Sequence, residues 1–183
     1  MIDSAITDIA HLFKQFGDKT YGEACDQRTH AISSAWHAQQ QNAPKTMVCA
    51  AFLHDIGHFI ADKNQLAGLD QWGHIDHDIL ASNWLQQKGF AASVYLPIRY
   101  HIEAKRYAAR RSGTDALSNA SRQTLQQQGG PMTDSEARDF EQLACFSQAM
   151  ELRRYDDLGK PNQAIDTSLS PWLAITKQVL TGN

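Results

Sequence analysis

The feature that most constrains the fold of this chain is a charged pair, His54-Asp55, inside its most apolar segment, CAAFLHDIGH. An unpaired carboxylate in a protein core costs several kcal/mol, so the fold must bring a compensating group to the pair. A buried His-Asp hydrogen bond is one such compensation, and a bound metal ion is another. Six of the eight histidines lie close together, at His30, His37, His54, His58, His74 and His77. This density makes a metal site the leading hypothesis.

Composition places the chain among small globular proteins. Its 183 residues fit a single domain, residues 1–183, and 42% hydrophobic residues suffice for a core. No long apolar run is present, and Asp3 and Asp8 occupy the stretch where an export signal needs basic and then apolar residues. A net charge of -3 disfavours a nucleic-acid partner, and three widely spaced cysteines fit reduced thiols. We expect a cytoplasmic protein without a membrane partner, and no pattern indicates its oligomeric state.

Apolar residues recur at helical spacing along most of the chain, whereas strand patterns are nearly absent. The predicted class is therefore all-α. Gly, Pro and Asn interrupt the pattern and separate the expected helices. These cover 3–16, 26–41, 45–56 ending near Gly57, 74–88, a segment that starts after Pro97 at the latest, 118–128 within an excursion over 111–133, 133–158, and a short C-terminal segment near Pro171.

Further candidate ligands lie far from the pair in sequence. They are His30, His77, His101 and the doublet Asp156-Asp157. Each falls on a different expected helix, so they meet the pair only if the helices pack into a bundle around it. Imidazole and carboxylate ligands suit iron with exchangeable positions, whereas structural zinc favours thiolates. An aspartate such as Asp55 can bridge two metal ions through its two oxygens.

Motifs between residues 21 and 160 together resemble one family. They are Tyr21-Gly22-Glu23 ahead of His30, HDIGH at 54–58, HDILASNWL at 77–85, HIEAKRY at 101–107, LSNASRQTLQQQGGPM at 117–132 and LRRYDDLGK at 152–160. Their order is similar to that of the HD-domain superfamily, and closest to its mixed-valence di-iron oxygenases, the branch of 2-amino-1-hydroxyethylphosphonate dioxygenase that is akin to myo-inositol oxygenase. The resemblance implies an HD-domain helical bundle with two iron ions, Fe2+ and Fe3+, in its core.

The resemblance also implies a set of metal ligands. The expected ligands are His30, His54 and Asp156 for one iron, His77 and His101 for the other, and Asp55 as the bridge. In LRRYDDLGK the family's ligand follows the aromatic residue, which selects Asp156 over Asp157. His74 lies on a similar helix face to His77, and the HDILASNWL match favours His77. His54, Asp55 and Lys105 are the expected catalytic residues.

A second set of residues is expected to bind substrate. It comprises Tyr21, Glu23, His58, Lys105, Ser121, Thr124 and Arg153. By resemblance, Lys105 and the two hydroxyl residues hold phosphonate oxygens together with Arg153, although a solvated helix face is the alternative for Lys105. The resemblance also implies that Tyr21 caps an iron before substrate arrives and that Glu23 receives the amine of the substrate. His58 is expected beside the metals or the substrate, with a surface position as the alternative.

The implied activity is O2-dependent cleavage of the C–P bond of a small 1-hydroxyphosphonate, in organophosphonate catabolism. For (R)-2-amino-1-hydroxyethylphosphonate the products are phosphate and glycine, and for other substrates the analogous carboxylate. An HD-domain phosphohydrolase acting on a nucleotide or other phosphate ester is the alternative, because it needs the same His and Asp ligands. A metal-binding module without turnover is a third hypothesis. Lys105, Glu23 and the SNASRQT segment favour the oxygenase.

Overall fold

A computed structural model describes residues 2–68, 72–114, 117–161 and 165–182 of the chain. Every regular element in these ranges is an α-helix, which confirms the predicted all-α class. The helices are α1 (Ile2–Phe16), α2 (Gln27–Gln40), α3 (Lys45–Leu53), α4 (Ile56–Lys63), α5 (His77–Gln87), α6 (Ala92–Arg99), α7 (His101–Ser112), α8 (Asn119–Gln127), α9 (Asp134–Glu141), α10 (Phe146–Leu158) and α11 (Ser170–Thr181).

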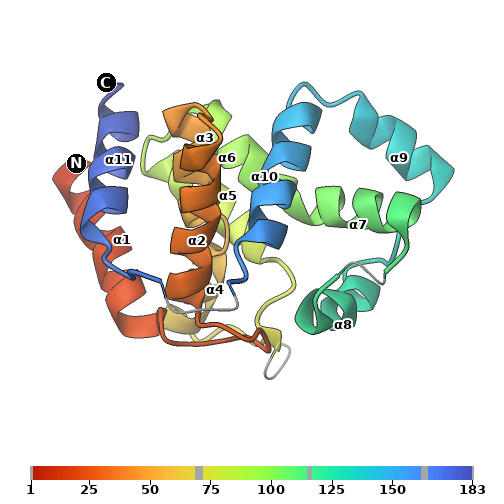
Figure 1. Cartoon of the computed structure of the whole chain (residues 1–183), viewed down its shortest axis with the longest axis horizontal. Helices are drawn as coiled ribbons and strands as arrows, with labels where there is room; N and C mark the ends of the chain where they lie inside the picture. Colours follow the sequence, from red (N-terminus) through yellow and green to blue (C-terminus); the bar gives the residue numbers. More distant parts are fainter. Residues whose placement is uncertain (1, 69–71, 115–116, 162–164, 183) are drawn as a thin grey trace.

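The main bundle is formed by α1 to α6 together with α10 and α11. In Figure 1, α2 stands upright at the centre with α3 behind it, α1 and α11 flank it on one side, and α10 lies on the other. The arm made of α7, α8 and α9 extends beyond α10. The site described below lies where this arm meets the bundle, because its residues come from both parts.

Aromatic packing fixes the interior of the main bundle. The ring of Phe13 stacks on that of Phe52 at a centroid distance of 4.7 Å and meets the edge of Phe59 at 5.1 Å. All three side chains are at most 2% exposed, and burying each contributes about 2 kcal/mol. These contacts tie α1 to α3 and α4, and so fix the position of the turn between α3 and α4 that carries the His-Asp pair.

The turn between α3 and α4 differs from the prediction. A helix ending near Gly57 was expected, but α3 ends at Leu53 and α4 begins at Ile56, so Gly57 lies in the first turn of a new helix. Gly57 is needed for close packing, because a Cβ there would lie 1.8 Å from the carbonyl oxygen of His77 on α5. The prediction that the helix ends near Gly57 was wrong, because the glycine at this position serves close packing against α5 and does not end a helix.

The helix expected over 133–158 is two helices, α9 and α10, joined by a turn. A straight helix would place Phe140 and Phe146 on different faces, since six residues rotate by about 600°. The turn brings both rings against Tyr107 of α7, at centroid distances of 5.7 and 5.4 Å. Burial of this aromatic cluster outweighs the local preference for one continuous helix.

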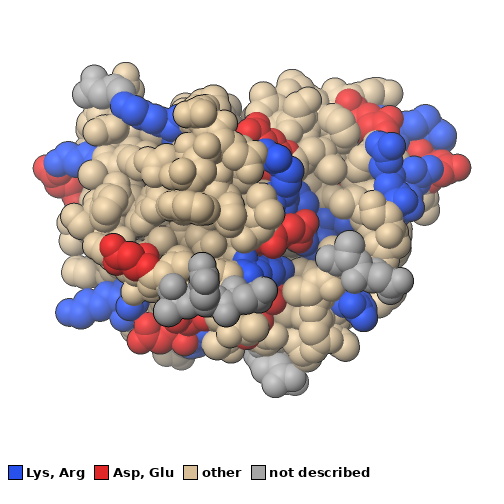
Figure 2. All heavy atoms as spheres, in the orientation of Figure 1, with Lys and Arg blue, Asp and Glu red and all other residues tan. Residues whose placement is uncertain are grey.

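Pro97 lies inside α6 rather than before a new helix, and α7 begins separately at His101. The other expected helices occur close to their predicted bounds. Among the described helices, none has the length and apolarity required to cross a bilayer. On the face drawn in Figure 2, Lys and Arg side chains are interspersed with Asp and Glu rather than gathered into one basic patch.

Candidate metal centre and substrate cavity

The interruption between α3 and α4 is what aims two consecutive side chains at one site. Neighbouring residues on a continuous helix point about 100° apart. His54 and Asp55 instead form the turn that links the two helices, so both side chains reach the centre of the bundle. His54 is fully buried, and the side chain of Asp55 is 18% exposed.

His30, His54 and Asp156 form the first group of candidate ligands. The Nε2 atoms of His30 and His54 lie 3.1 Å apart, and Oδ1 of Asp156 lies 3.2 Å from Nε2 of His30. His30 projects from α2, whose first turn is capped by the carboxylate of Asp26, and Asp156 projects from α10. Two helices and the turn between α3 and α4 thus supply one group.

Asp55, His77 and His101 form the second group of candidate ligands. The Nε2 atoms of His77 and His101 lie 3.1 Å apart, and Oδ1 of Asp55 lies 3.4 Å from Nε2 of His77. His77 is the first residue of α5, and His101 is the first residue of α7. Glycine at position 57 lets α4 approach α5 closely enough for this group to form.

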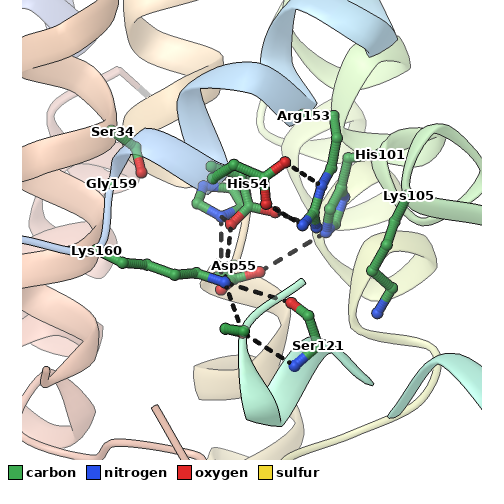
Figure 3. A network of polar contacts seen from close by, with 12 residues as sticks. Ser34, His54, Asp55, His101, Lys105, Ser121, Arg153, Gly159 and Lys160 are labelled. Atoms are coloured by element: carbon green, nitrogen blue, oxygen red, sulfur yellow. Dashed lines mark hydrogen bonds and ion pairs between the residues drawn. The ribbon is translucent and has the colours of Figure 1, made fainter. Parts of the chain in front are cut away.

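Asp55 connects the two groups through its two oxygens. Oδ2 lies 3.5 Å from Nε2 of His54 and 3.7 Å from that of His30, while Oδ1 faces His77 and His101. Figure 3 shows the Asp55 carboxylate between His54 and His101. This is the arrangement in which one carboxylate can bind two metal ions.

All four imidazoles are held in one tautomer by backbone carbonyls. Nδ1 of His54, His77 and His101 lies 2.7–2.9 Å from the carbonyl oxygen three residues earlier, and Nδ1 of His30 lies 2.9 Å from the Gly159 carbonyl. A carbonyl oxygen only accepts hydrogen bonds, so each neutral ring carries its proton on Nδ1. Each Nε2 therefore presents a lone pair to the centre, as metal-binding imidazoles do.

The donor set fits metal ions. In each group, two Nε2 atoms lie 3.1 Å apart with their lone pairs facing each other. This arrangement is unfavourable unless a cation or a proton lies between the two atoms. Carboxylate oxygens from Asp55 and Asp156 complete the groups, and no cysteine belongs to either. Nitrogen and oxygen donors of this kind suit iron and other divalent metals.

Burial and neighbouring charges favour the metal-binding protonation states in the second group, whereas in the first group, against the effect of burial, the hydrogen bond with Asp156 raises the pKa of His30. Burial together with the adjacent His77 and His54 lowers the pKa of His101 to about 3, and burial likewise lowers that of His77. Although burial opposes it, the surrounding imidazoles, foremost His54, hold the pKa of Asp55 well below its usual value. The second group therefore presents neutral imidazoles and an ionised carboxylate at neutral pH.

Arg153 orients Asp156. Its Nη1 donates to Oδ2 of Asp156 at 2.7 Å, which turns Oδ1 toward His30, and its Nε donates to Asp157 at 3.1 Å. The guanidinium is buried, whereas the side chain of Asp157 is 43% exposed and pairs with Arg153. The structure thus brings Asp156, and not Asp157, into a group of candidate metal ligands.

A cavity of about 60 Å³ opens beside the two groups. All seven residues expected to bind substrate line it: Tyr21, Glu23, His58, Lys105, Ser121, Thr124 and Arg153. Lys105 is 3% exposed, and its Nζ donates to Oγ1 of Thr124 at 3.1 Å. Burial and the charge of Arg153 lower the pKa of Lys105 to about 7. The cavity therefore combines candidate metal ligands on one side with cations and hydroxyls on the other.

Comparison with known proteins identifies the family. The chain is 35% identical over 165 residues to "Hydroxymethylphosphonate dioxygenase" of Gimesia maris, covering 85% of this chain and 78% of that protein. It is 34% identical over 156 residues to "[1-hydroxy-2-(trimethylamino)ethyl]phosphonate dioxygenase (glycine-betaine-forming)" of Leisingera caerulea, covering 83% and 78%. The chain belongs to the phosphonate dioxygenase family. It is accordingly an oxygenase, and the phosphohydrolase alternative is not favoured.

Two further comparisons complete this picture. "Uncharacterized protein L432" of Acanthamoeba polyphaga mimivirus is 35% identical over 158 residues, covering 85% of this chain and 72% of that protein. No family model matches the chain. Membership of the phosphonate dioxygenases thus rests on the two named relatives, whose similarity extends over most of the chain.

Tyr21 and Glu23, which are expected to contact an iron and the substrate, are hydrogen-bonded to other side chains in the structure. The hydroxyl of Tyr21 donates to Asp62, and its ring contacts that of His58 at a centroid distance of 4.6 Å. The carboxylate of Glu23 pairs with Lys160, whose Nζ lies 2.9 Å from Oε1. Both residues line the cavity without contacting the metal groups through these polar atoms.

His58 and His74 form a layer behind the second group. His58 is 6% exposed, so a surface position is excluded, and its ring stacks on His77 at 3.9 Å. Its Nδ1 accepts a hydrogen bond from the backbone N–H of His74 at 3.0 Å, which leaves its proton on Nε2. His74 precedes α5, and its Nε2 lies 3.1 Å from Oδ1 of Asp62. Neither belongs to the two candidate metal groups.

Sequence reasoning assigned no role to two residues of this site. Lys160 ends the LRRYDDLGK motif, four residues after Asp156, and that spacing was the signal that it faces the same centre. Asp62 carried no recognisable signal, yet it accepts hydrogen bonds from Lys19 and Tyr21 and contacts His74. Both act through tertiary contacts that no local pattern records.

Proposed function

We propose that the chain uses dioxygen to cleave the carbon–phosphorus bond of a small 1-hydroxyphosphonate at a centre of two iron ions. The products are phosphate and the carboxylate derived from C1, with one dioxygen consumed per phosphate released. The observation that carries the proposal is Asp55, whose two oxygens face two separate groups of candidate ligands beside a cation-lined cavity. Kinship with dioxygenases named for phosphonates supports it.

His30, His54 and Asp156 would hold one iron, and His77 with His101 the other, with Asp55 shared. When bound, an Fe(II)/Fe(III) pair supplies Lewis acidity toward the hydroxyl of the substrate and the redox capacity that dioxygen activation requires. Arg153 holds Asp156 in its orientation, and the four backbone carbonyls hold the rings in theirs. The protein thus presents a preorganised ligand set.

The phosphonate group would be bound on the opposite side of the cavity. The ammonium of Lys105 and the hydroxyls of Ser121 and Thr124 line it there, and they match the anionic oxygens of a phosphonate in charge and hydrogen bonding. This placement would direct C1 and its hydroxyl toward the imidazole groups. Lys105 neutralises charge in a buried site, where electrostatic interactions are stronger than in water.

The test is anaerobic reconstitution of the protein with iron, followed by addition of hydroxymethylphosphonate or (R)-2-amino-1-hydroxyethylphosphonate and then oxygen. We expect two iron ions per chain, a substrate-perturbed electron paramagnetic resonance signal, and phosphate release matched by oxygen uptake. Hydrolysis of phosphate esters with Mn(II), without an oxygen requirement, would overturn the proposal in favour of the phosphohydrolase. Lys105→Ala lacks the ammonium proposed to bind the phosphonate. We expect this variant to bind phosphonate much more weakly while it retains its iron.

A further inference from the structure

His30 differs from the other three imidazoles of the centre in what holds its ring. Nδ1 of His54, His77 and His101 lies beside the carbonyl oxygen three residues earlier, so the local backbone fixes these rings. Nδ1 of His30 instead lies 2.9 Å from the carbonyl oxygen of Gly159, which is 129 residues later in the chain. The orientation and tautomer of His30 therefore depend on how the end of α10 packs against α2.

Gly159 reaches His30 because it has no side chain. It ends α10, where its N–H donates to the carbonyls of Tyr155 and Asp156, and its φ of −71° is open to any residue. A Cβ at this position would lie 1.9 Å from Oγ of Ser34 and 3.1 Å from Nδ1 of His30. Packing, and not backbone conformation, thus requires glycine here.

Ser34 is the residue of α2 that meets Gly159, and Figure 3 shows the two side by side. It lies one turn after His30 on the same helix face and is fully buried. Its Oγ donates to the backbone carbonyl of His30 at 2.9 Å, so the hydroxyl is hydrogen-bonded within its own helix. A larger side chain at position 34 would push the Gly159 carbonyl away from His30, because a close-packed interior has no room to absorb it.

The contact between Ser34 and Gly159 also affects Asp156. Asp156 lies on α10 three residues before Gly159, and its Oδ1 lies 3.2 Å from Nε2 of His30. Moving the end of α10 away from α2 would therefore change the contacts at both ring nitrogens of His30. One close contact between two helices thus sets the relative positions of two of the three ligands in the first group.

We propose that Ser34 is a positioning residue for the first group of candidate ligands, because its small side chain lets the Gly159 carbonyl accept a hydrogen bond from Nδ1 of His30. The proposal rests on the proposed function and adds to it a residue that acts through His30. The imidazoles of the second group are held by local carbonyls, so they do not depend on this contact. A substitution at position 34 should affect the first group and spare the second.

The test replaces Ser34 with valine, which places a larger methyl group where Oγ meets Gly159. In the full-length, iron-loaded protein, Ser34→Val should weaken iron binding at the first group by about tenfold or more and leave the second group within about twofold of wild type. Metal analysis during titration with a chelator measures both, because one iron per chain should leave well ahead of the other. Ser34→Ala keeps Cβ and removes only Oγ, and it should bind both irons within about twofold of wild type.

Ser33→Val is the matched control. Ser33 is a buried neighbour of Ser34 on the same helix, and it lines a groove beside Ile32 and Trp36. The control thus receives the same substitution in the same helix but away from Gly159. It should bind both irons as wild type does.

Nuclear magnetic resonance gives a readout that does not depend on iron. In long-range proton–nitrogen correlation spectra of the metal-free, full-length protein, the Nδ1 proton of His30 should exchange slowly with solvent, because a buried carbonyl accepts it. Its exchange should become faster by about tenfold or more in Ser34→Val and stay unchanged in Ser33→Val. The Nδ1 proton of His54, held by the local carbonyl of Ala51, is the internal reference and should stay protected in both variants.

A rescue experiment separates positioning from a general effect on stability. Gly159→Ala creates the clash from the other side, and it should weaken iron binding at the first group by about tenfold or more. Adding Ser34→Gly removes both atoms of Ser34 that the new Cβ would meet. The double variant should regain most of the lost affinity, although a glycine inside α2 lowers the stability of that helix.

The outcomes separate this proposal from the proposed function. If the iron-loaded wild type releases no phosphate with oxygen, the proposed function is wrong, and the exchange of the His30 proton still decides the role of Ser34. If phosphate is released but Ser34→Val and Ser33→Val bind iron equally well, or if Ser34→Gly does not improve Gly159→Ala, the role assigned to Ser34 is wrong. If Ser34→Val does not fold, the two Gly159 variants decide the case.

Discussion

Gly57 packs so closely against the backbone of His77 that a Cβ at position 57 would lie 1.8 Å from the His77 carbonyl oxygen. That contact joins the helix following Asp55 to the helix that begins with His77, and so connects Asp55 to the other candidate ligands of the second group. The separation of the two helices is therefore set by a backbone atom rather than by side chains that could adjust.

Gly57→Ala should push α5 away from α4. Overpacking of this kind costs about 3 kcal/mol, and for a chain of this size we expect the midpoint of thermal unfolding to fall by about 10 °C. Iron bound by His77 and His101 should be lost before iron bound by the other group, as measured by iron content and electron paramagnetic resonance. Gly113→Ala is the control, because its φ of 74° strains the backbone while no atom lies within 4 Å of its Cβ. Equal iron loss in both variants would contradict this prediction.

Asp156 and Asp157 should respond very differently to the same substitution. Asp156→Asn removes the carboxylate that faces His30, and it should weaken iron binding at that group by about 100-fold or more and abolish oxygen uptake. Asp157→Asn removes only a partly exposed partner of Arg153, and iron content should stay within about twofold of wild type. Metal analysis after dialysis against a chelator measures both. Greater iron loss in Asp157→Asn would reverse the assignment of the doublet.

Much of the fold could be predicted from the sequence because helical periodicity is a local property. The spacing of apolar residues located most helices, and the all-α class followed from it. The placement of His30, His77 and His101 on separate helices indicated that they meet only through tertiary packing, and the structure brings them together. Their roles as iron ligands stay predictions.

What the sequence did not reveal depends on contacts between helices. The break at His54-Asp55 follows from the approach of α4 to His77, and no local breaker residue marks it. The turn between α9 and α10 serves the packing of Phe140 and Phe146 on Tyr107. Such effects arise only after the chain has collapsed, so they leave no local pattern.

Tyr21 and Asp62 should be energetically coupled. The hydroxyl of Tyr21 donates to Asp62, and burial together with that hydrogen bond raises the pKa of Tyr21. In a double-mutant cycle of Tyr21→Phe and Asp62→Asn, urea unfolding should give a coupling free energy of about 1 kcal/mol. Iron content should not change in Tyr21→Phe, because the hydroxyl is engaged by Asp62. If the two substitutions change the free energy of unfolding additively, or if Tyr21→Phe loses iron, the Tyr21 hydroxyl binds a group other than Asp62.

The pH dependence of the reaction should be determined by Lys105. Burial and Arg153 lower its pKa to about 7 in the unliganded enzyme, and the ammonium must be charged to bind the phosphonate. Raising the pH through this value removes the charge, so kcat/KM, which reports the free enzyme, should fall above about pH 7. Lys105→Arg keeps its charge at higher pH, and it should move the fall in kcat/KM upward by at least one pH unit, whatever its effect on the maximal rate. Lys88→Arg, at an ion pair with Asp8 remote from the cavity, should retain the wild-type profile. A profile that is identical in wild type and Lys105→Arg would show that another group controls the alkaline limb.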